Sequence, residues 1–126
     1  MISFETFTLG QGSPIYQQIV LFLKRGMVGG TVLPGDELPS RRVLSALLGV
    51  NPNTIQRAYR ILEDEGLIES HSGAKSYVQL APGRVEALRQ ELLQSDFQTM
   101  IDAIRQSGLS RAEAHALLDA LWEVQP

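Results

Sequence analysis

The polar side chains of this chain that are best suited to chemistry lie between Leu38 and Leu62, in the stretch LPSRRVLSALLGVNPNTIQRAYRIL. This stretch holds four arginines and no acidic residue. Its amide and guanidinium groups recur at the spacing of one helical face, at Asn53, Gln56, Arg57 and Arg60. Asn and Gln can pair with adenine edges in the major groove of DNA, and Arg can pair with guanine. The pattern indicates a surface that faces a polyanion, although the net charge of the chain is −3.

Two short helices are needed to position these groups, and the sequence predicts both. Ser40 is placed to cap the first helix, which is expected to end at Gly49. The apolar stripe of this helix is predicted at Val43, Leu44 and Leu47. Arg41 and Arg42 lie at its start, where they are placed to meet DNA phosphates.

The second helix begins at Asn51-Pro52, which combines a capping side chain with proline at the first helical position. Its inner face is predicted to consist of Ile55, Ala58, Tyr59 and Leu62. A helix that enters the major groove must bury one face and present its N-terminal turns, and this spacing meets that requirement. Tyr59 could stack on a base, but its spacing places it in the core. Arg60 lies one turn further in, where it either contacts DNA or pairs with Glu63 and Asp64.

The residues before this stretch predict a supporting helix. Ser13-Pro14 resembles a serine cap followed by proline at the first helical position, and Gly29-Gly30 ends the run of helical spacing. Residues 1–12 alternate loosely between apolar and polar types, which indicates an extended arm.

The residues after it predict a hairpin. Residues 67–69 and 76–80 are typical of strands, with Gly73 at or near the turn between them. The order of helix, two-helix turn and hairpin is that of a winged helix-turn-helix. We place this DNA-binding domain, with its arm, at residues 1–81, because Ala81-Pro82-Gly83 is the clearest boundary in the chain.

Residues 82–126 are predicted to form two helices that meet near Gly108, the second opened by a capping box of Ser110 and Glu113. Many apolar residues of this tail need cover: Leu88, Leu92, Phe97, Met100, Ile101, Ile104, Leu117, Leu118, Leu121 and Trp122. We expect two copies of the chain to pack these helices together, so the tail is a dimerisation region. The alternative is that the tail folds back on its own N-terminal domain. The expected fold class is therefore α+β and mostly helical.

Composition excludes several kinds of protein. The chain has no cysteine, so it can form no disulfide and no thiolate metal site, which fits a cytoplasmic location. It has no signal-peptide pattern and no apolar run that could span a membrane. No phosphate loop, nucleophile motif or metal-ligand spacing is present, so we expect no enzyme activity, cofactor or metal.

Charge is divided unevenly along the chain. Residues 1–81 carry seven basic and seven acidic residues, whereas residues 82–126 carry four basic and seven acidic ones. The acidic surplus therefore belongs to the tail. The placement of charge, rather than the net value, decides whether a face can bind nucleic acid.

Several segments match one known family. PIYQQIV, LPSRRVLSALLGV and NPNTIQRAY, followed by a tail of about 45 residues, closely resemble the GntR family of bacterial transcription regulators, and specifically its YtrA subfamily. The resemblance covers roughly residues 13–80 by motif. It implies a homodimeric regulator that binds operator DNA, usually as a repressor.

The resemblance also implies roles for particular residues. Arg42 matches the family's arginine in the motif L-P-S-x-R, which contacts phosphate or base. The recognition-helix start is matched by Asn51, Asn53 and Thr54, and its exposed face by Gln56 and Arg57. Gly73 matches the wing-tip glycine that lets the backbone approach the minor groove. The wing departs from the family pattern, because His71-Ser72 stand where similar proteins often carry basic residues. Lys75 is then the charged residue at the tip of the wing.

The predicted function is sequence-specific binding of double-stranded DNA, at a pseudo-palindromic operator that matches a protein dimer. The alternative is a winged-helix module that docks on another protein, for which apolar or acidic anchors would be expected on the exposed face of residues 51–62. The sequence leaves a small-molecule effector open as a partner but does not identify one, and it predicts no membrane partner.

Overall fold

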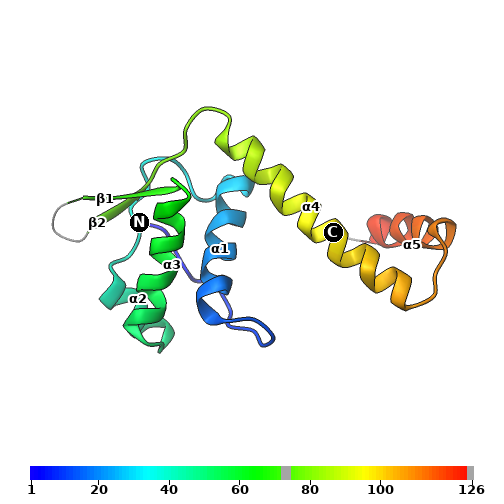
Figure 1. Ribbon diagram of the computed structural model, residues 1–126, viewed down its shortest axis with the longest axis horizontal. Coiled ribbons are helices and arrows are strands. Elements are labelled where there is room, and N and C mark those ends of the chain that lie inside the picture. Colours follow the sequence, from blue (N-terminus) through cyan, green and yellow to red (C-terminus); the bar gives the residue numbers. More distant parts are fainter. Residues whose placement is uncertain (72–74, 125–126) are drawn as a thin grey trace. The chain divides into compact units, whose positions relative to one another are not determined.

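The structure is a computed structural model that describes residues 1–71 and 75–124. It divides the chain into two compact units, Met1–Arg89 (unit 1) and Gln90–Pro126 (unit 2). The elements, labelled in Figure 1, are α1 (Ile15–Gly29), α2 (Arg41–Leu48), α3 (Pro52–Asp64), β1 (Ile68–His71), β2 (Lys75–Val78), α4 (Arg84–Gln106) and α5 (Arg111–Val124). The predicted fold class, mostly helical α+β with an N-terminal winged helix-turn-helix, is confirmed.

The core of unit 1 forms around α3, which packs against α1, α2 and β1. Its predicted inner face is confirmed, because Ile55, Ala58, Tyr59 and Leu62 are all 0% exposed. α1 contributes the fully buried side chains of Ile19 and Leu23 to the same core. Burial on three sides therefore leaves one face of α3 for solvent.

Side-chain caps start two of the helices as predicted. The Ser40 hydroxyl accepts a hydrogen bond from the backbone N–H of Val43 at 3.1 Å, and Asn51 Oδ1 accepts one from the N–H of Asn53 at 2.8 Å. The predicted cap at Ser13 is wrong. Pro14 occupies the capping position of α1 without a side-chain bond, and the helix begins one residue later.

The predicted apolar stripe of α2 is also wrong in part. Leu44 is fully buried, but Val43 is 54% exposed and Leu47 is 65% exposed. α2 has only eight residues and packs against α3, so the buried side of the helix is narrow and includes Ser45 instead. The Ser45 hydroxyl donates to the carbonyl of Val50, which satisfies this buried polar group.

β1 and β2 pair antiparallel, with Ile68 opposite Val78. The segment 35–38 continues this sheet along the other edge of β2, which the sequence analysis did not predict. The Gly35 N–H donates to the Val78 carbonyl at 2.8 Å, and the Leu38 N–H donates to the Ser76 carbonyl at 2.9 Å. The hairpin is therefore attached to the segment that leads directly into α2.

The N-terminal arm packs on unit 1. The Ile2 N–H donates to the carbonyl of Glu37 at 2.9 Å, and Phe4 is 6% exposed. Phe4 and Phe7 both contact the ring of Phe22 on α1, with ring centroids 5.0 and 5.2 Å away. The arm therefore covers part of the core of this domain.

The beginning of α4 also belongs to unit 1. Glu65 Oε1 lies 2.8 Å from Lys24 Nζ on α1 and 3.8 Å from Arg84 Nη2 on α4. Leu88 is fully buried, and Arg89 Nη2 donates to the carbonyl of Val28 at 3.2 Å. The division of the chain therefore falls after Arg89, whereas the sequence analysis placed a domain boundary at residue 81.

Unit 2 contains the rest of α4 and α5. The predicted capping box at the start of α5 is present, because the Ser110 N–H donates to Glu113 and the Glu113 N–H donates to the Ser110 hydroxyl. The hydrogen bond from the Ser110 backbone N–H, and secondarily the Ser110 hydroxyl, lower the pKa of the Glu113 carboxyl. Among the described residues, no helix has both the length and the apolar character needed to cross a membrane.

Two leucines of α2 allow a matched test of the core. Leu44→Ala should lower the free energy of unfolding by about 2–5 kcal/mol, because it empties a fully buried position. Leu47→Ala, on the same helix, should change it by less than about 0.5 kcal/mol, because Leu47 is mostly exposed. Urea unfolding followed by circular dichroism measures both. Equal losses would contradict the assigned orientation of α2.

Candidate nucleic-acid interface

The exposed face of α3 carries the hydrogen-bonding groups that the sequence analysis placed there. Asn53, Gln56 and Arg60 are exposed, on the side opposite the buried inner face. None of their side chains has a hydrogen-bond or ion-pair partner in the described part of the chain. Arg60 in particular is not paired with Glu63 or Asp64, which was one of its two predicted states. This face therefore has free donors and acceptors for an external polar partner.

The first turn of α3 is fixed by its own cap. Asn51 is exposed, and its Oδ1 is occupied by the N–H of Asn53. Its amide nitrogen keeps two donors without an acceptor within residues 1–71 and 75–124. Thr54 is half-buried, and its N–H donates to the carbonyl of Asn51 at 2.9 Å. Asn51 and Thr54 thus define where the helix starts.

The two arginines at the start of α2 differ in environment. The Arg42 side chain is exposed and has no partner among the described residues, as a phosphate ligand requires. The Arg41 side chain lies inward, with its guanidinium carbon 5.2 Å from the centroid of the Tyr59 ring. Its Nη2 lies 3.7 Å from Glu63 Oε1. Arg41 is therefore already engaged inside the domain.

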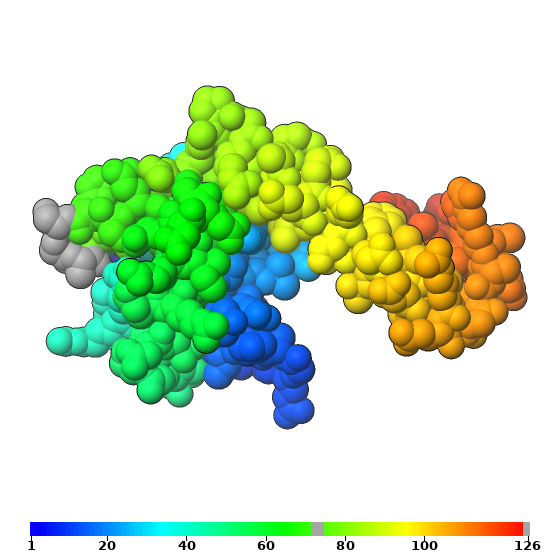
Figure 2. Space-filling model, viewed as in Figure 1, coloured from blue at the N-terminus to red at the C-terminus, as the bar shows by residue number. Residues whose placement is uncertain are grey.

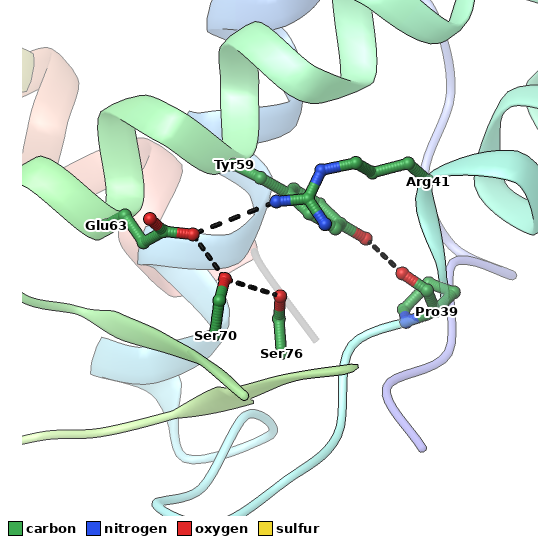
Figure 3. A network of polar contacts seen from close by, with 6 residues as sticks. All are labelled: Pro39, Arg41, Tyr59, Glu63, Ser70 and Ser76. Atoms are coloured by element: carbon green, nitrogen blue, oxygen red, sulfur yellow. Dashed lines mark hydrogen bonds and ion pairs between the residues drawn. The ribbon is translucent and has the colours of Figure 1, made fainter. Parts of the chain in front are cut away.

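A polar network connects α2, α3 and the hairpin (Figure 3). The Glu63 carboxylate accepts a hydrogen bond from the Ser70 hydroxyl on β1 and faces Arg41 on α2. The hydroxyls of Ser70 and Ser76 lie 3.1 Å apart, and Ser76 is only 2% exposed. The network therefore joins α3 to both strands of the hairpin.

Tyr59 adds a second link between α3 and the chain before α2. Its hydroxyl donates to the carbonyl of Pro39 at 2.6 Å (Figure 3). Burial raises the pKa of the Tyr59 hydroxyl, so it stays a protonated donor over the ordinary pH range. The predicted core position of Tyr59 is therefore confirmed, in place of the alternative that its ring stacks on a base.

Arg57 is exposed, as predicted, but it has a partner that the sequence analysis missed. Its guanidinium carbon lies 3.9 Å from the ring centroid of Tyr16, in the first turn of α1. The sequence contains the tyrosine in PIYQQIV, but a contact between residues so far apart leaves no local pattern that would predict it. The candidate surface therefore includes the start of α1.

The wing is described on both sides of its tip. Gly73 lies outside the described residues. Lys75 is exposed at the start of β2, opposite His71 in the strand register, and has no partner in the described ranges. The His71 ring stands edge-on to Tyr77, with centroids 5.1 Å apart, and its Nε2 lies 3.6 Å from Glu69 Oε1. Lys75 is thus the basic group that the described wing offers.

No group of three metal-ligating side chains occurs in the part of the chain that the structure describes. The polar residues brought together on unit 1 are amides, arginines and hydroxyls around α3. Such a surface suits hydrogen bonding to base edges and to phosphates.

Comparisons with known proteins agree on one family. The model described as "Bacterial regulatory proteins, gntR family" matches residues 15–78. The HTH-type transcriptional repressor YtrA of Bacillus subtilis is 38% identical over 88 residues, which cover 65% of this chain and 68% of that protein.

Solved structures give the same result. A GntR family transcriptional regulator from Listeria monocytogenes has a TM-score of 0.78 and 32% identity, and the match covers 89% of this chain and 98% of that one. The DNA-binding domain of AraR in complex with operator ORX1 has a TM-score of 0.51 and 29% identity, over 56% of this chain and 92% of that one.

The Glu63 network allows a test of the link to the wing. Glu63→Ala should lower the free energy of unfolding by about 0.5–1.5 kcal/mol, because Ser70 loses its hydrogen-bond acceptor and Arg41 loses its ion-pair partner. Glu63→Gln should lose less, because its amide oxygen can still accept from Ser70. Urea titration of the two variants measures the difference. An unchanged Glu63→Ala variant would show that the network does not hold the hairpin.

Proposed function

Because this chain belongs to the gntR family of bacterial regulatory proteins, we propose that it represses transcription as a homodimer bound to a pseudo-palindromic operator. Transcription regulators of this family bind DNA. Repression is the activity named for the similar YtrA of Bacillus subtilis. The alternative of a protein-docking module finds no support on α3, whose exposed residues Asn53, Gln56 and Arg60 are polar or basic.

The observation that carries the proposal is the division of α3 into two faces. Its apolar residues are fully buried, while Asn53, Gln56 and Arg60 are exposed and have no partner among the described residues. A recognition helix needs this arrangement, because base edges are read by side chains that are free to donate and accept. Asn53 and Gln56 lie nearest the N-terminal end of α3, the end that enters the groove in helix-turn-helix proteins.

Phosphate contacts are assigned to residues that flank this face. We assign Arg42 to a phosphate at the start of α2 and Lys75 to one at the wing, with Gly73 at the wing tip as the family resemblance implies. Arg41 could reach a phosphate only by leaving Glu63 and Tyr59, so we expect it to contribute less than Arg42. Backbone contacts of this kind position a protein on DNA without reading its sequence.

The tail supports the homodimer. Unit 2 exposes large apolar side chains on both of its helices: Phe97 at 51%, Leu117 at 51%, Leu121 at 52% and Trp122 at 74%. An apolar groove between α4 and α5, within unit 2, is lined by Ile104, Leu118 and neighbouring residues. Soluble monomers rarely leave contiguous apolar surface uncovered. A second copy of the tail would cover it, and the two-fold symmetry would be matched by an inverted repeat in the operator.

Selection of duplexes from a random pool tests the proposal as a whole. The full chain should enrich sequences with two inverted half-sites whose centres lie about 34 Å apart, or a multiple of that distance. A reporter gene placed behind the selected operator should be expressed less when the chain is co-expressed. A pool that stays random after selection would contradict DNA recognition, and increased reporter expression would contradict repression.

Two substitutions should distinguish a residue that positions the protein on the DNA backbone from one that reads the base sequence. Arg42→Ala should weaken binding to operator and random duplexes alike, and should lower the slope of log affinity against log salt by about one. Gln56→Ala should cost about 1–3 kcal/mol on the operator and little on a random duplex. Fluorescence anisotropy over a salt series measures both. If neither variant changes affinity, the wrong face of the domain has been assigned.

The oligomeric state can be tested with two matched leucines. Leu121→Asp should shift the protein from dimer to monomer in sedimentation experiments at micromolar concentration, because it places a carboxylate in the apolar contact. Leu33→Asp is the control, because Leu33 is 53% exposed in unit 1 and Leu121 is 52% exposed in unit 2. A wild-type protein that sediments as a monomer would rule out the dimer.

A further inference from the structure

The contact between Arg57 and Tyr16 joins the exposed face of α3 to the start of α1. The guanidinium carbon of Arg57 lies 3.9 Å from the centroid of the Tyr16 ring. The face of a tyrosine ring carries partial negative charge and attracts a cation within about 6 Å of its centroid. The planar guanidinium can lie against the ring while the N–H groups at its edge remain free to donate. The contact therefore orients Arg57 without using up its donors.

Tyr16 is itself held in place. Gln17 Nε2 donates to the Tyr16 hydroxyl at 3.2 Å. Gln18 Oε1 accepts from the N–H of Gly10 at 2.7 Å, and its Nε2 donates to the carbonyl of Ser13 at 2.9 Å. These bonds fix the segment that leads into α1, and the buried Ile19 anchors the first turn to the core. The ring that faces Arg57 thus projects from a fixed backbone.

The position of this pair places it beside the candidate interface. The N-terminal ends of α1 and α3 lie at the same end of unit 1 (Figure 1). In the space-filling view, the blue surface of the start of α1 adjoins the green surface of α3 (Figure 2). Gln56 and Arg60, the neighbours of Arg57 on α3, have no comparable support in the described part of the chain.

We propose that Tyr16 is a positioning residue for DNA recognition, whose ring holds the Arg57 guanidinium so that its N–H groups meet the operator in one direction. This inference rests on the proposed function. An exposed arginine otherwise samples many rotamers, and the loss of conformational entropy on selecting one of them weakens binding. Stacking on a fixed ring selects the rotamer before DNA arrives, which favours a partner with an acceptor in the matching place.

The proposed role of Tyr16 differs from that of a residue that attracts DNA only through its charge. Removal of the Tyr16 ring leaves the charge of Arg57 intact, so attraction to any duplex is retained. What is lost is the direction of its hydrogen bonds. Tyr16 should therefore affect discrimination between the operator and random DNA, with little effect on the salt dependence.

Two variants of Tyr16 test this role on the full chain. Tyr16→Leu should raise the operator Kd about two- to fivefold, by fluorescence anisotropy with the selected operator duplex. The Kd for a random duplex of equal length should stay unchanged. Tyr16→Phe keeps the ring and should bind as the wild type does. Equal losses for Phe and Leu would assign the effect to the hydroxyl and overturn the proposal.

A double-mutant cycle tests whether Tyr16 acts through Arg57. In the Arg57→Ala background, Tyr16→Leu should cause no further loss of operator affinity. Additive losses would overturn the proposal. Leu21→Ala serves as a control on the same helix, because Leu21 is a partly exposed residue with no assigned contact. Circular dichroism melting curves of all variants check that unit 1 remains folded.

A readout without DNA separates this inference from the proposed function. In nuclear magnetic resonance spectra, the Nε proton of Arg57 should be shifted upfield by the Tyr16 ring in the wild type and in Tyr16→Phe, but not in Tyr16→Leu. An unshifted wild-type signal would overturn the stacking itself. If the wild type binds neither duplex, the proposed function fails and the role of Tyr16 with it. If the wild type and Tyr16→Leu bind the operator equally, this inference alone fails.

Discussion

Complete burial of one face of α3 is the constraint on which the rest of unit 1 depends. Tyr59 and Leu62 are in contact with the core on one side of the helix, so the side that carries Gln56 has only solvent to face. Rotation of α3 about its axis would expose apolar area and bury amides at the same time, at a cost of several kcal/mol. Packing of the core determines the orientation of α3. The supporting helices, the hairpin and the caps stabilise α3 in that orientation. Specific hydrogen bonding by α3 therefore depends first on hydrophobic packing.

Local patterns made much of this arrangement predictable. The periodicity of α3 and the caps at Ser40 and Asn51 involve residues within one or two helical turns of each other, so the sequence alone contains the information. The same holds for the capping box at Ser110 and Glu113. The exposed positions of Arg42 and Gln56 follow from the same helical periodicity.

Contacts between distant segments were not predictable in this way. Leu47 has the spacing of a core residue, but the short α2 has neighbours on one narrow side only. In the sequence, Ser70 and Ser76 look like ordinary strand residues. Their part in the polar network depends on the position of Glu63 in the folded domain. Tyr16 is 41 positions from Arg57 along the chain. Each of these outcomes was decided by tertiary packing, which overrides local preference.

The distribution of aromatic residues has a practical consequence for spectroscopy. The single tryptophan of the chain, Trp122, is 74% exposed and lies in unit 2, whereas Tyr16, Tyr59 and Tyr77 all lie in unit 1. Indole emission responds to its surroundings and moves to shorter wavelength when water is excluded. Excitation at the red edge, where tyrosine does not absorb, would therefore report only on the tail. The native chain carries its own optical label for one of its two units, without any dye.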